Sequence, residues 1–285
     1  MCFSYDPKEE EWMVVDGLQR IHTIVKFLEG GDWKLSNLDD INPDIAGKSA
    51  AEIKGSDSDL KKYYQRVENL TLPITVLRCD HTNKQHLEYL FMIFRRLNTG
   101  GMKLNNQEIR NCIYGGTFNN LLKELDEIPS WHRINKIKHG QLNRFKKQEL
   151  ILRFFAFYSN YHNYKGKLAE HINEFMHVNR NISKEKKEEF SELFKETSNF
   201  IYKIIFGEKS TDNISGTIIE ALFVGVAKNL DYLKNIQTEQ VKNMYKKLLE
   251  HPNFSEHSLA AGLSNKDKVI GRLNAAITIF SGQES

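Results

Sequence analysis

The stretch Val14-Val15-Asp16-Gly17-Leu18-Gln19-Arg20 decides the fold of the N-terminal part, because the hydrophobic pattern changes at Gly17. Before the glycine, Trp12 to Val15 are aromatic, apolar or β-branched, which favours a strand. After it, apolar residues recur at helical spacing from Ile21 to Leu28, and Gly30-Gly31 is a pair that ends helices. The stretch therefore predicts a strand, a glycine turn and a helix in direct succession.

The turn at Gly17 would present the unpaired N–H groups and the positive dipole of a helix start, which can hold a phosphate. Gly17 lets a ligand approach the backbone closely. Arg20 can bind an anionic oxygen, Gln19 can orient a water molecule, and Asp16 can hold Mg²⁺ or polarise a water. The same residues also fit an ordinary helix start, with Asp16 as the N-cap and Arg20 as a surface residue.

The segments around this turn complete a small mixed head. Cys2 to Tyr5 predicts a strand that reaches the strand of the turn through a polar hairpin loop. Leu72 to Leu77 predicts a third strand, and Pro73 indicates a sheet edge or a strand start. Lys84 to Leu97 has helical period.

The rest of the chain consists of amphipathic stretches separated by Gly and Pro, without a repeat period. The predicted fold class is α+β, with a small mixed head over residues 1–115 and a larger all-α helical domain over residues 116–285. The head carries 15 Lys and Arg against 17 Asp and Glu, whereas the helical part carries 25 against 20. The nearly neutral net charge of +3 therefore conceals an acidic head and a more basic body.

Composition excludes several classes of protein. The 285 residues are 40% hydrophobic, which is enough for a core and excludes a disordered chain. No run of about 18 apolar residues predicts a membrane span, and the N-terminus lacks a signal region. Three scattered cysteines indicate a reducing cytoplasm rather than a disulfide framework. No phosphate-binding P-loop or zinc motif is present, and His81 and His86 are expected at the surface.

A second motif is Phe94-Arg95-Arg96-Leu97-Asn98-Thr99-Gly100-Gly101, followed by a helix that Asn105 and Glu108 can cap. An ordinary connection between two helices explains the glycines and the cap. It does not require Arg95, Arg96 and Arg110 together, and clustered arginines suit the recognition of phosphate or carboxylate.

A third feature is a basic strip within residues 132–153, where seven basic side chains accompany one acid, Glu149. Trp131 and Phe145 interleave with the charges, so the strip could neutralise phosphates while the rings pack on sugars or bases. The alternative is a solvated helical face. The candidate nucleic-acid-binding residues are Arg133, Lys136, Lys138, Arg144, Lys146 and Lys147.

The first two motifs, in this order and at this spacing, resemble the N-terminal domain of GmrSD-type restriction endonucleases, also catalogued as domain of unknown function 262. The family signature is similar to an Asp-Gly-Gln-Gln-Arg turn followed by a Phe-x-Arg-Leu-Asn-Thr-Gly-Gly segment and a Glu-Ile-Arg helix. The resemblance covers about residues 12–115 and continues more weakly through Glu149-Leu150-Ile151-Leu152-Arg153.

The resemblance implies a head related to ParB and sulfiredoxin folds, and a role in prokaryotic DNA restriction and anti-phage defence. It implies binding and hydrolysis of a nucleoside triphosphate with Mg²⁺, which would make the chain an NTPase associated with an endonuclease. Asp16 and Gln19 would be catalytic, Asp16 would hold the metal, and Gly17 and Arg20 would bind the nucleotide. Arg95, Arg96 and Asn98 would surround that site. DNA and a nuclease supplied in trans would be the partners, with no membrane involved.

The sequence departs from the family pattern at three points. Leu18 stands where many relatives have Gln, the segment before Asp16 is shorter than in relatives, and no His-Asn-His nuclease motif follows the helical part. The short segment leads us to expect that Cys2 to Tyr5 lacks a neighbour in the sheet. Two alternatives stay open: a non-catalytic DNA-binding or regulatory module, and a truncated family member without activity.

Overall fold

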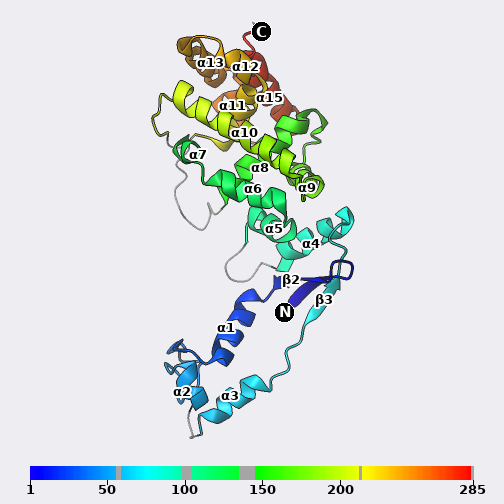
Figure 1. Ribbon diagram of the computed structural model, residues 1–285, viewed down its shortest axis with the longest axis vertical. Helices are drawn as coiled ribbons and strands as arrows, with labels where there is room; N and C mark the ends of the chain where they lie inside the picture. The colour runs from blue at the N-terminus through cyan, green and yellow to red at the C-terminus, as the bar shows by residue number, and fades with distance from the viewer. Residues whose placement is uncertain (56–58, 98–103, 135–144, 212–213, 284–285) are drawn as a thin grey trace. The chain divides into compact units, whose positions relative to one another are not determined.

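The computed structural model describes residues 1–55, 59–97, 104–134, 145–211 and 214–283 (Figure 1). The chain forms two compact units, Met1–Lys103 and Leu104–Ser285. We call them the head and the helical unit and describe each by itself. Together they confirm the α+β fold class, with a small mixed sheet in the head and helices in the other unit.

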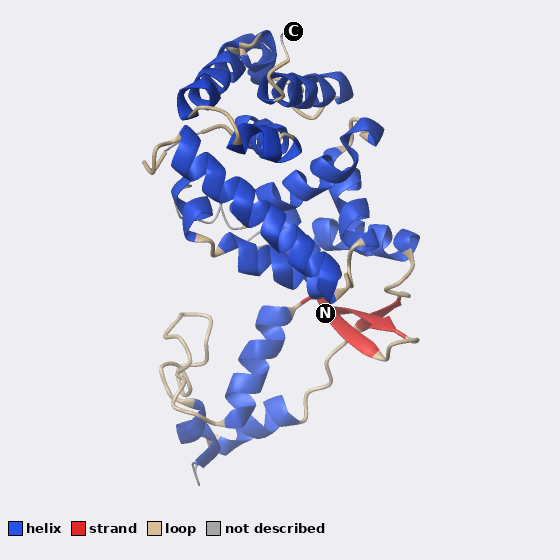
Figure 2. Cartoon of the chain, turned by 45° about the horizontal axis from the view of Figure 1, so that its top comes forward, coloured by secondary structure: helices blue, strands red, loops and turns tan. Residues whose placement is uncertain are grey.

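The head contains a three-stranded sheet, drawn in red in Figure 2. Strand β1 (Cys2–Asp6) pairs antiparallel with β2 (Glu11–Asp16) and parallel with β3 (Thr75–Arg78). The strand order is β2-β1-β3, so β1 has a neighbour on both sides. The expectation that this strand lacks a neighbour is therefore wrong, because the segment after Pro73 supplies the second one. Pro73 itself precedes the strand, which lies at the edge of the sheet.

One face of this sheet is covered. Side chains alternate between the two faces of a strand, and Cys2, Ser4 and Asp6 of β1 are buried. Helix α4 (Lys84–Leu97) contacts β2 and has a buried stripe at helical spacing that includes Leu87 and Leu90. The predicted bounds of this helix are confirmed.

A second, smaller apolar cluster lies at the far end of helix α1 (Leu18–Glu29). Phe27 packs there with residues of α2 (Ala50–Gly55) and α3 (Lys61–Glu68). The helix ends at Gly30, whose φ of 72° is left-handed, as the glycine pair predicted. Phe27 is the buried residue of α1, whereas Leu18, Gln19 and Arg20 at its start are exposed.

The helical unit accounts for the rest of the described chain. Its α-helices are α5 (Asn106–Ile113), α6 (Thr117–Asp126), α7 (Pro129–Ile134), α8 (Lys146–Asn160), α9 (Leu168–Val178), α10 (Lys184–Phe200), α11 (Gly216–Lys228), α12 (Leu230–Lys234), α13 (Thr238–Glu250), α14 (Glu256–Ala260) and α15 (Lys266–Phe280). A π-helical segment, Ile201–Ile205, continues α10, and short 3₁₀ turns occupy Tyr161–Asn163 and Pro252–Phe254. No described helix is long and apolar enough to cross a membrane.

The core of the helical unit is aromatic and closely packed. Phe154 and Phe155 of α8 meet Phe194 of α10, and Phe223 of α11 stacks on Phe194 at 5.6 Å between ring centroids. Helix α11 also packs closely on α15, because a Cβ added at Gly225 would lie 2.9 Å from the backbone of Ala276. These contacts give the helical unit a conventional, closely packed apolar core.

The division between the units falls between Lys103 and Leu104, before α5 begins at Asn106. The whole of α5 therefore belongs to the helical unit, where it contacts α8. Its start is the predicted one. The side chain of Asn105 accepts from the N–H groups of Gln107 and Glu108, and Glu108 accepts from the N–H of Asn105, which is a capping box. The predicted domain boundary after residue 115 stays a prediction, which truncation can test.

Candidate functional site

The turn between β2 and α1 has the predicted order of strand, glycine and helix. Gly17 has a φ of 97°, which strongly favours glycine, and a Cβ added there would lie 2.6 Å from Cγ of Met1. No side chain caps the helix, whose first residue is Leu18. The interpretation of Asp16 as the N-cap is therefore wrong: Gly17 occupies that position. Among the described residues, no side chain accepts from the first N–H groups of α1.

The carboxylate of Asp16 instead contacts the guanidinium of Arg20. Nη2 of Arg20 donates to Oδ2 of Asp16 at 2.5 Å, and both side chains are partly exposed, at 60% for Arg20 and 34% for Asp16. Gln19 lies between them in sequence with an exposed side chain. The structure thus brings Asp16, Gly17, Gln19 and Arg20 together in one short, solvent-accessible turn. An exposed ion pair of this kind contributes about 0–1 kcal/mol, so solvent or an anion can replace it at low cost.

Arg95 and Arg96 occupy the last turn of α4, in the same unit as the turn, and both are exposed. Neither forms an ion pair or a side-chain hydrogen bond within the described residues. A basic residue at a helix C-terminus is also favoured by the helix dipole, which explains their position without any ligand. Asn98, the third of these secondary candidates, lies outside the described residues.

The basic strip is divided between several environments. Arg133 donates to the hydroxyl of Tyr202 at 2.9 Å and lies over its ring. The ammonium of Lys147 donates to the carbonyls of Trp131 and His132 at the end of α7, and burial lowers its pKa to about 8. Lys146 is exposed. Lys136, Lys138 and Arg144 lie outside the described residues.

The aromatic residues of the strip differ from each other. Trp131 is only 1% exposed and packs edge-on against both Phe194 and Phe223, so the expectation that its ring packs on sugars or bases is wrong. The cause is its packing on Phe194 and Phe223, which are more than sixty positions further along the chain. Phe145 is 44% exposed and immediately precedes α8.

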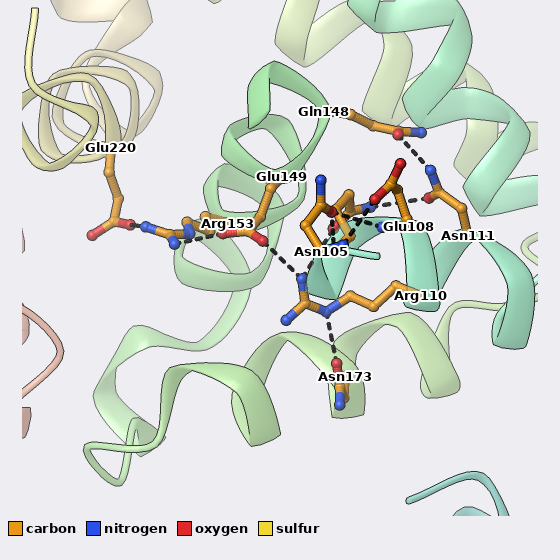
Figure 3. Close-up of polar contacts among 10 residues, drawn as sticks. Asn105, Glu108, Arg110, Asn111, Gln148, Glu149, Arg153, Asn173 and Glu220 are labelled. Atoms are coloured by element: carbon orange, nitrogen blue, oxygen red, sulfur yellow. Dashed lines mark hydrogen bonds and ion pairs between the residues drawn. The ribbon is translucent and has the colours of Figure 1, made fainter. Parts of the chain in front are cut away.

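The helical unit contains a buried polar cluster centred on Arg110 (Figure 3). This guanidinium is 1% exposed and donates to Asn173 at 2.7 Å, to Gln107 at 3.1 Å and to Glu149 at 2.9 Å. Asn111, one turn away from Gln107, donates to Gln148 of α8 at 2.8 Å. Arg110 is therefore fully engaged inside the unit and is not available for a phosphate, contrary to the grouping with Arg95 and Arg96.

The cluster continues along α8 to a second carboxylate. Arg153 donates to Glu149 at 2.5 Å and lies 3.7 Å from the carboxylate of Glu220. Burial raises the pKa of Glu149, but the charges of Arg153 and Arg110 outweigh it and hold the pKa below its ordinary value. Burial raises the pKa of Glu220, against the opposing charges of Arg153 and Arg272. The Glu-Ile-Arg helix and the Glu149 to Arg153 segment thus meet in one structural cluster.

A buried group of polar residues that the sequence did not reveal lies in the head. Oγ of Ser4 is 3.0 Å from Nε2 of His81, and Nδ1 of His81 is 3.8 Å from the carboxylate of Asp6. Burial raises the pKa of Asp6, but the N–H groups of His81, Lys8 and Glu9 that donate to it lower the pKa overall. His81 is 1% exposed, so its predicted surface position is wrong, whereas His86 is exposed.

These three residue types also form hydrolase triads, but the environment here is unsuitable for catalysis. Ser4 and Asp6 are 0% exposed, so no substrate can reach the hydroxyl. The group fixes the loop after β3 to β1. Only the parallel pairing of β1 and β3, which brings together residues 77 positions apart, creates it, and no local sequence signal indicates that pairing.

The turn in the head has no ready-made metal site within the part of the chain that the structure describes. Among the described residues, no group of three or more His, Cys, Asp or Glu side chains could hold a metal ion. Mg²⁺ could bind at Asp16 only with further ligands from phosphate and water, which is a usual arrangement for this ion. An open cavity of about 290 Å³ lies between α8, α9 and α10, and the predicted site residues do not line it.

The fold and the turn define an α+β head with a strand–glycine–helix turn, linked to a helical unit. Residues 1–115 match the family model described as the N-terminal domain of the GmrSD restriction endonuclease. The match covers the head and the start of the helical unit, and the predicted resemblance is confirmed. No curated protein and no solved structure matches the chain.

Proposed function

We propose that this chain is a nucleotide-binding component of a prokaryotic DNA restriction system, and that the turn at Gly17 holds the phosphates of a nucleoside triphosphate. The observation that carries the proposal is the turn itself. An exposed ion pair between Asp16 and Arg20 flanks a helix start without a side-chain cap, in the part of the chain that matches the restriction family. Coupling of nucleotide state to DNA or to a nuclease supplied in trans belongs to the same proposal.

The proposed binding uses the groups that the turn leaves accessible. The first N–H groups of α1 donate to phosphate oxygens, which the helix dipole also favours. Arg20 exchanges its partner, leaving Asp16 for a phosphate oxygen, and this exchange costs little because the pair is exposed. Asp16 is then free to hold Mg²⁺, which would neutralise phosphate charge. Gln19 is the residue of this turn that can orient an attacking water.

Nucleotide titration of the purified chain, followed by thermal unfolding with and without Mg²⁺, tests the proposal. A ligand that binds only the folded state raises the melting temperature. We expect ATP or GTP to raise it, and Asp16→Ala and Arg20→Ala to abolish the rise. Lys26→Ala, in the last turn of the same helix, is the matched control and should respond like the unchanged chain. Full nucleotide affinity in both turn variants would refute the proposed site.

Hydrolysis is tested separately from binding. If the chain is an NTPase, Gln19→Ala should bind nucleotide with unchanged affinity and lose phosphate release. If the unchanged chain binds nucleotide without releasing phosphate, the non-catalytic module is the correct alternative.

Leu18→Gln restores the polar residue of the family pattern at a position that is 61% exposed, so it should fold normally and strengthen nucleotide binding.

A further inference from the structure

The second face of the head sheet carries three aromatic residues, of which Trp12 is exposed and Phe3 and Tyr5 are half-buried. Phe3 and Tyr5 point away from the buried side chains of β1, and the strand register aligns their neighbours with them. Val14 and Val76 flank Phe3, whereas Trp12 and Arg78 flank Tyr5. We call these six residues the aromatic face. Its two rows run across all three strands.

The rings of the aromatic face form a contiguous platform. The Trp12 ring lies 4.7 Å from that of Tyr5 at an interplanar angle of 34°, and its centroid is 6.2 Å from that of Phe3. Trp12 is 61% exposed and Val76 is 44% exposed. Trp131, in contrast, is buried in the helical unit. An exposed aromatic ring grouped with two half-buried ones on a folded sheet is typical of a surface that binds a partner.

The charged residues near the platform leave one cation available to a ligand. Arg78, on β3, is exposed and forms no side-chain hydrogen bond or ion pair with any described residue. Lys8, near the same end of the sheet, is already paired with Asp80 at 2.7 Å. Glu11, which is also exposed, pairs with the buried Asp6 and so lies on the opposite face of the sheet. An anionic group on the aromatic face is therefore favoured beside Arg78.

We propose that the aromatic face binds single-stranded DNA, with a base stacked on Trp12 and Tyr5 and a backbone phosphate at Arg78. Each base has a π-face that stacks on an aromatic ring regardless of its identity, and the neighbouring strands place the cation beside the stack. In a duplex the bases are already stacked on each other, so this platform favours a single strand. Arg78 favours a polynucleotide over an uncharged peptide. The choice of DNA rests on the restriction function proposed above.

The test is fluorescence anisotropy of a labelled oligonucleotide of twelve thymidines, titrated with the full chain at low and moderate salt. We expect saturable binding, and Trp12→Ala should weaken it about fivefold or more, which is the lower range for loss of one stacked base. Arg78→Gln should reduce the slope of log affinity against log salt by about 0.7, the value for one phosphate contact on a single strand.

Matched controls come from the same unit. Tyr89→Ala removes another exposed aromatic ring, on α4, and Arg66→Gln removes another exposed arginine, on α3. Both should retain the affinity and the salt slope of the unchanged chain. Trp12→Phe keeps a ring at the platform and should bind more tightly than Trp12→Ala. The melting temperature of each variant establishes that it is folded.

Three results would overturn the inference: no binding of the oligonucleotide, equal loss of binding in Tyr89→Ala or Arg66→Gln, or preferred binding of duplex DNA or of oligouridine. Arg20→Ala separates this inference from the proposed function. It should lose nucleotide binding and keep the affinity for the oligonucleotide, because Arg20 is not on the aromatic face. The unchanged chain could fail to bind nucleotide and still bind the oligonucleotide through Trp12. In that case only the nucleotide proposal fails.

Discussion

Two carboxylate–guanidinium contacts, one in each unit, have the same chemistry and opposite surroundings. In the head, Arg20 contacts Asp16 across a single turn, and 60% of its side chain is exposed. In the helical unit, Arg110 contacts Glu149, is 1% exposed and has further partners in Asn173 and Gln107. The first contact can exchange its partner for an external anion. The second is part of the fold, because a buried guanidinium that loses its acceptors is left without compensation.

The comparison shows that arginines in a family motif are not equivalent. Arg20 and Arg110 both belong to segments that resemble the family signature, yet only Arg20 can reach a ligand without unfolding its surroundings. Substitutions at the two positions should therefore separate stability from binding, and the expected losses of stability decrease from the helical unit to the head.

The largest effect is expected for Arg110→Met. Removing one partner of a buried ion pair typically costs about 3–5 kcal/mol, and Glu149 keeps Arg153, so we expect about 3 kcal/mol, near the lower limit of that range. Urea unfolding followed by circular dichroism measures it. Arg110→Lys is the control that keeps the charge but lacks the second arm of the guanidinium. Its free energy of unfolding should lie between those of the unchanged chain and Arg110→Met. A loss below that of Arg20→Met would refute the structural role of Arg110.

The next effect is expected for Gly225→Ala. The added Cβ would lie 2.9 Å from the backbone carbon and oxygen of Ala276, and a backbone neighbour cannot move aside as a flexible side chain does. Overpacking of this kind costs about 1–3 kcal/mol. Gly115→Ala is the matched control in the same unit, because its Cβ would meet nothing within 4 Å. Equal melting temperatures for the two variants would contradict the close packing of α11 on α15.

Elements with local signals were predictable from the sequence, and contacts between distant segments were not. The glycine that starts α1, the bounds of α4 and the capping box at Asn105 all follow from neighbouring residues. The central position of β1 and the burial of His81 depend on parallel pairing with β3, across more than seventy residues.

The same distinction applies to the candidate site. The residues of the Asp16 to Arg20 turn are contiguous, so their juxtaposition follows once strand and helix are recognised. The role of Arg110 depends on Glu149 and Asn173, which are 39 and 63 positions away. Their proximity in the sequence grouped Arg110 with Arg95 and Arg96, but Arg110 is buried and the other two are exposed.

A smaller effect is expected from Lys147 and depends on pH. Burial lowers its pKa from 10.5 to about 8, so between these values the folded chain has released a proton that the unfolded chain still holds. The free energy of unfolding should therefore rise with pH across this interval through this residue. The measurement is the difference between the urea midpoints of one protein at pH 7.5 and at pH 10. Lys147→Met should change this difference relative to the unchanged chain, because it removes the contribution of Lys147. Lys146→Met, on the exposed neighbour, should leave the difference between the two midpoints unchanged.

The smallest effect on stability is expected for Arg20→Met and Asp16→Asn. Exposed pairs contribute about 0–1 kcal/mol, and the helix start has Gly17 rather than Asp16 as its N-cap, so neither substitution removes a cap. Urea unfolding should place both variants within about 1 kcal/mol of the unchanged chain. A loss as large as that of Arg110→Met would mean that the turn is held by its ion pair and cannot exchange Asp16 for a phosphate, because the exchange would then cost the head its fold. A small loss together with a lost nucleotide response would instead assign the pair to binding.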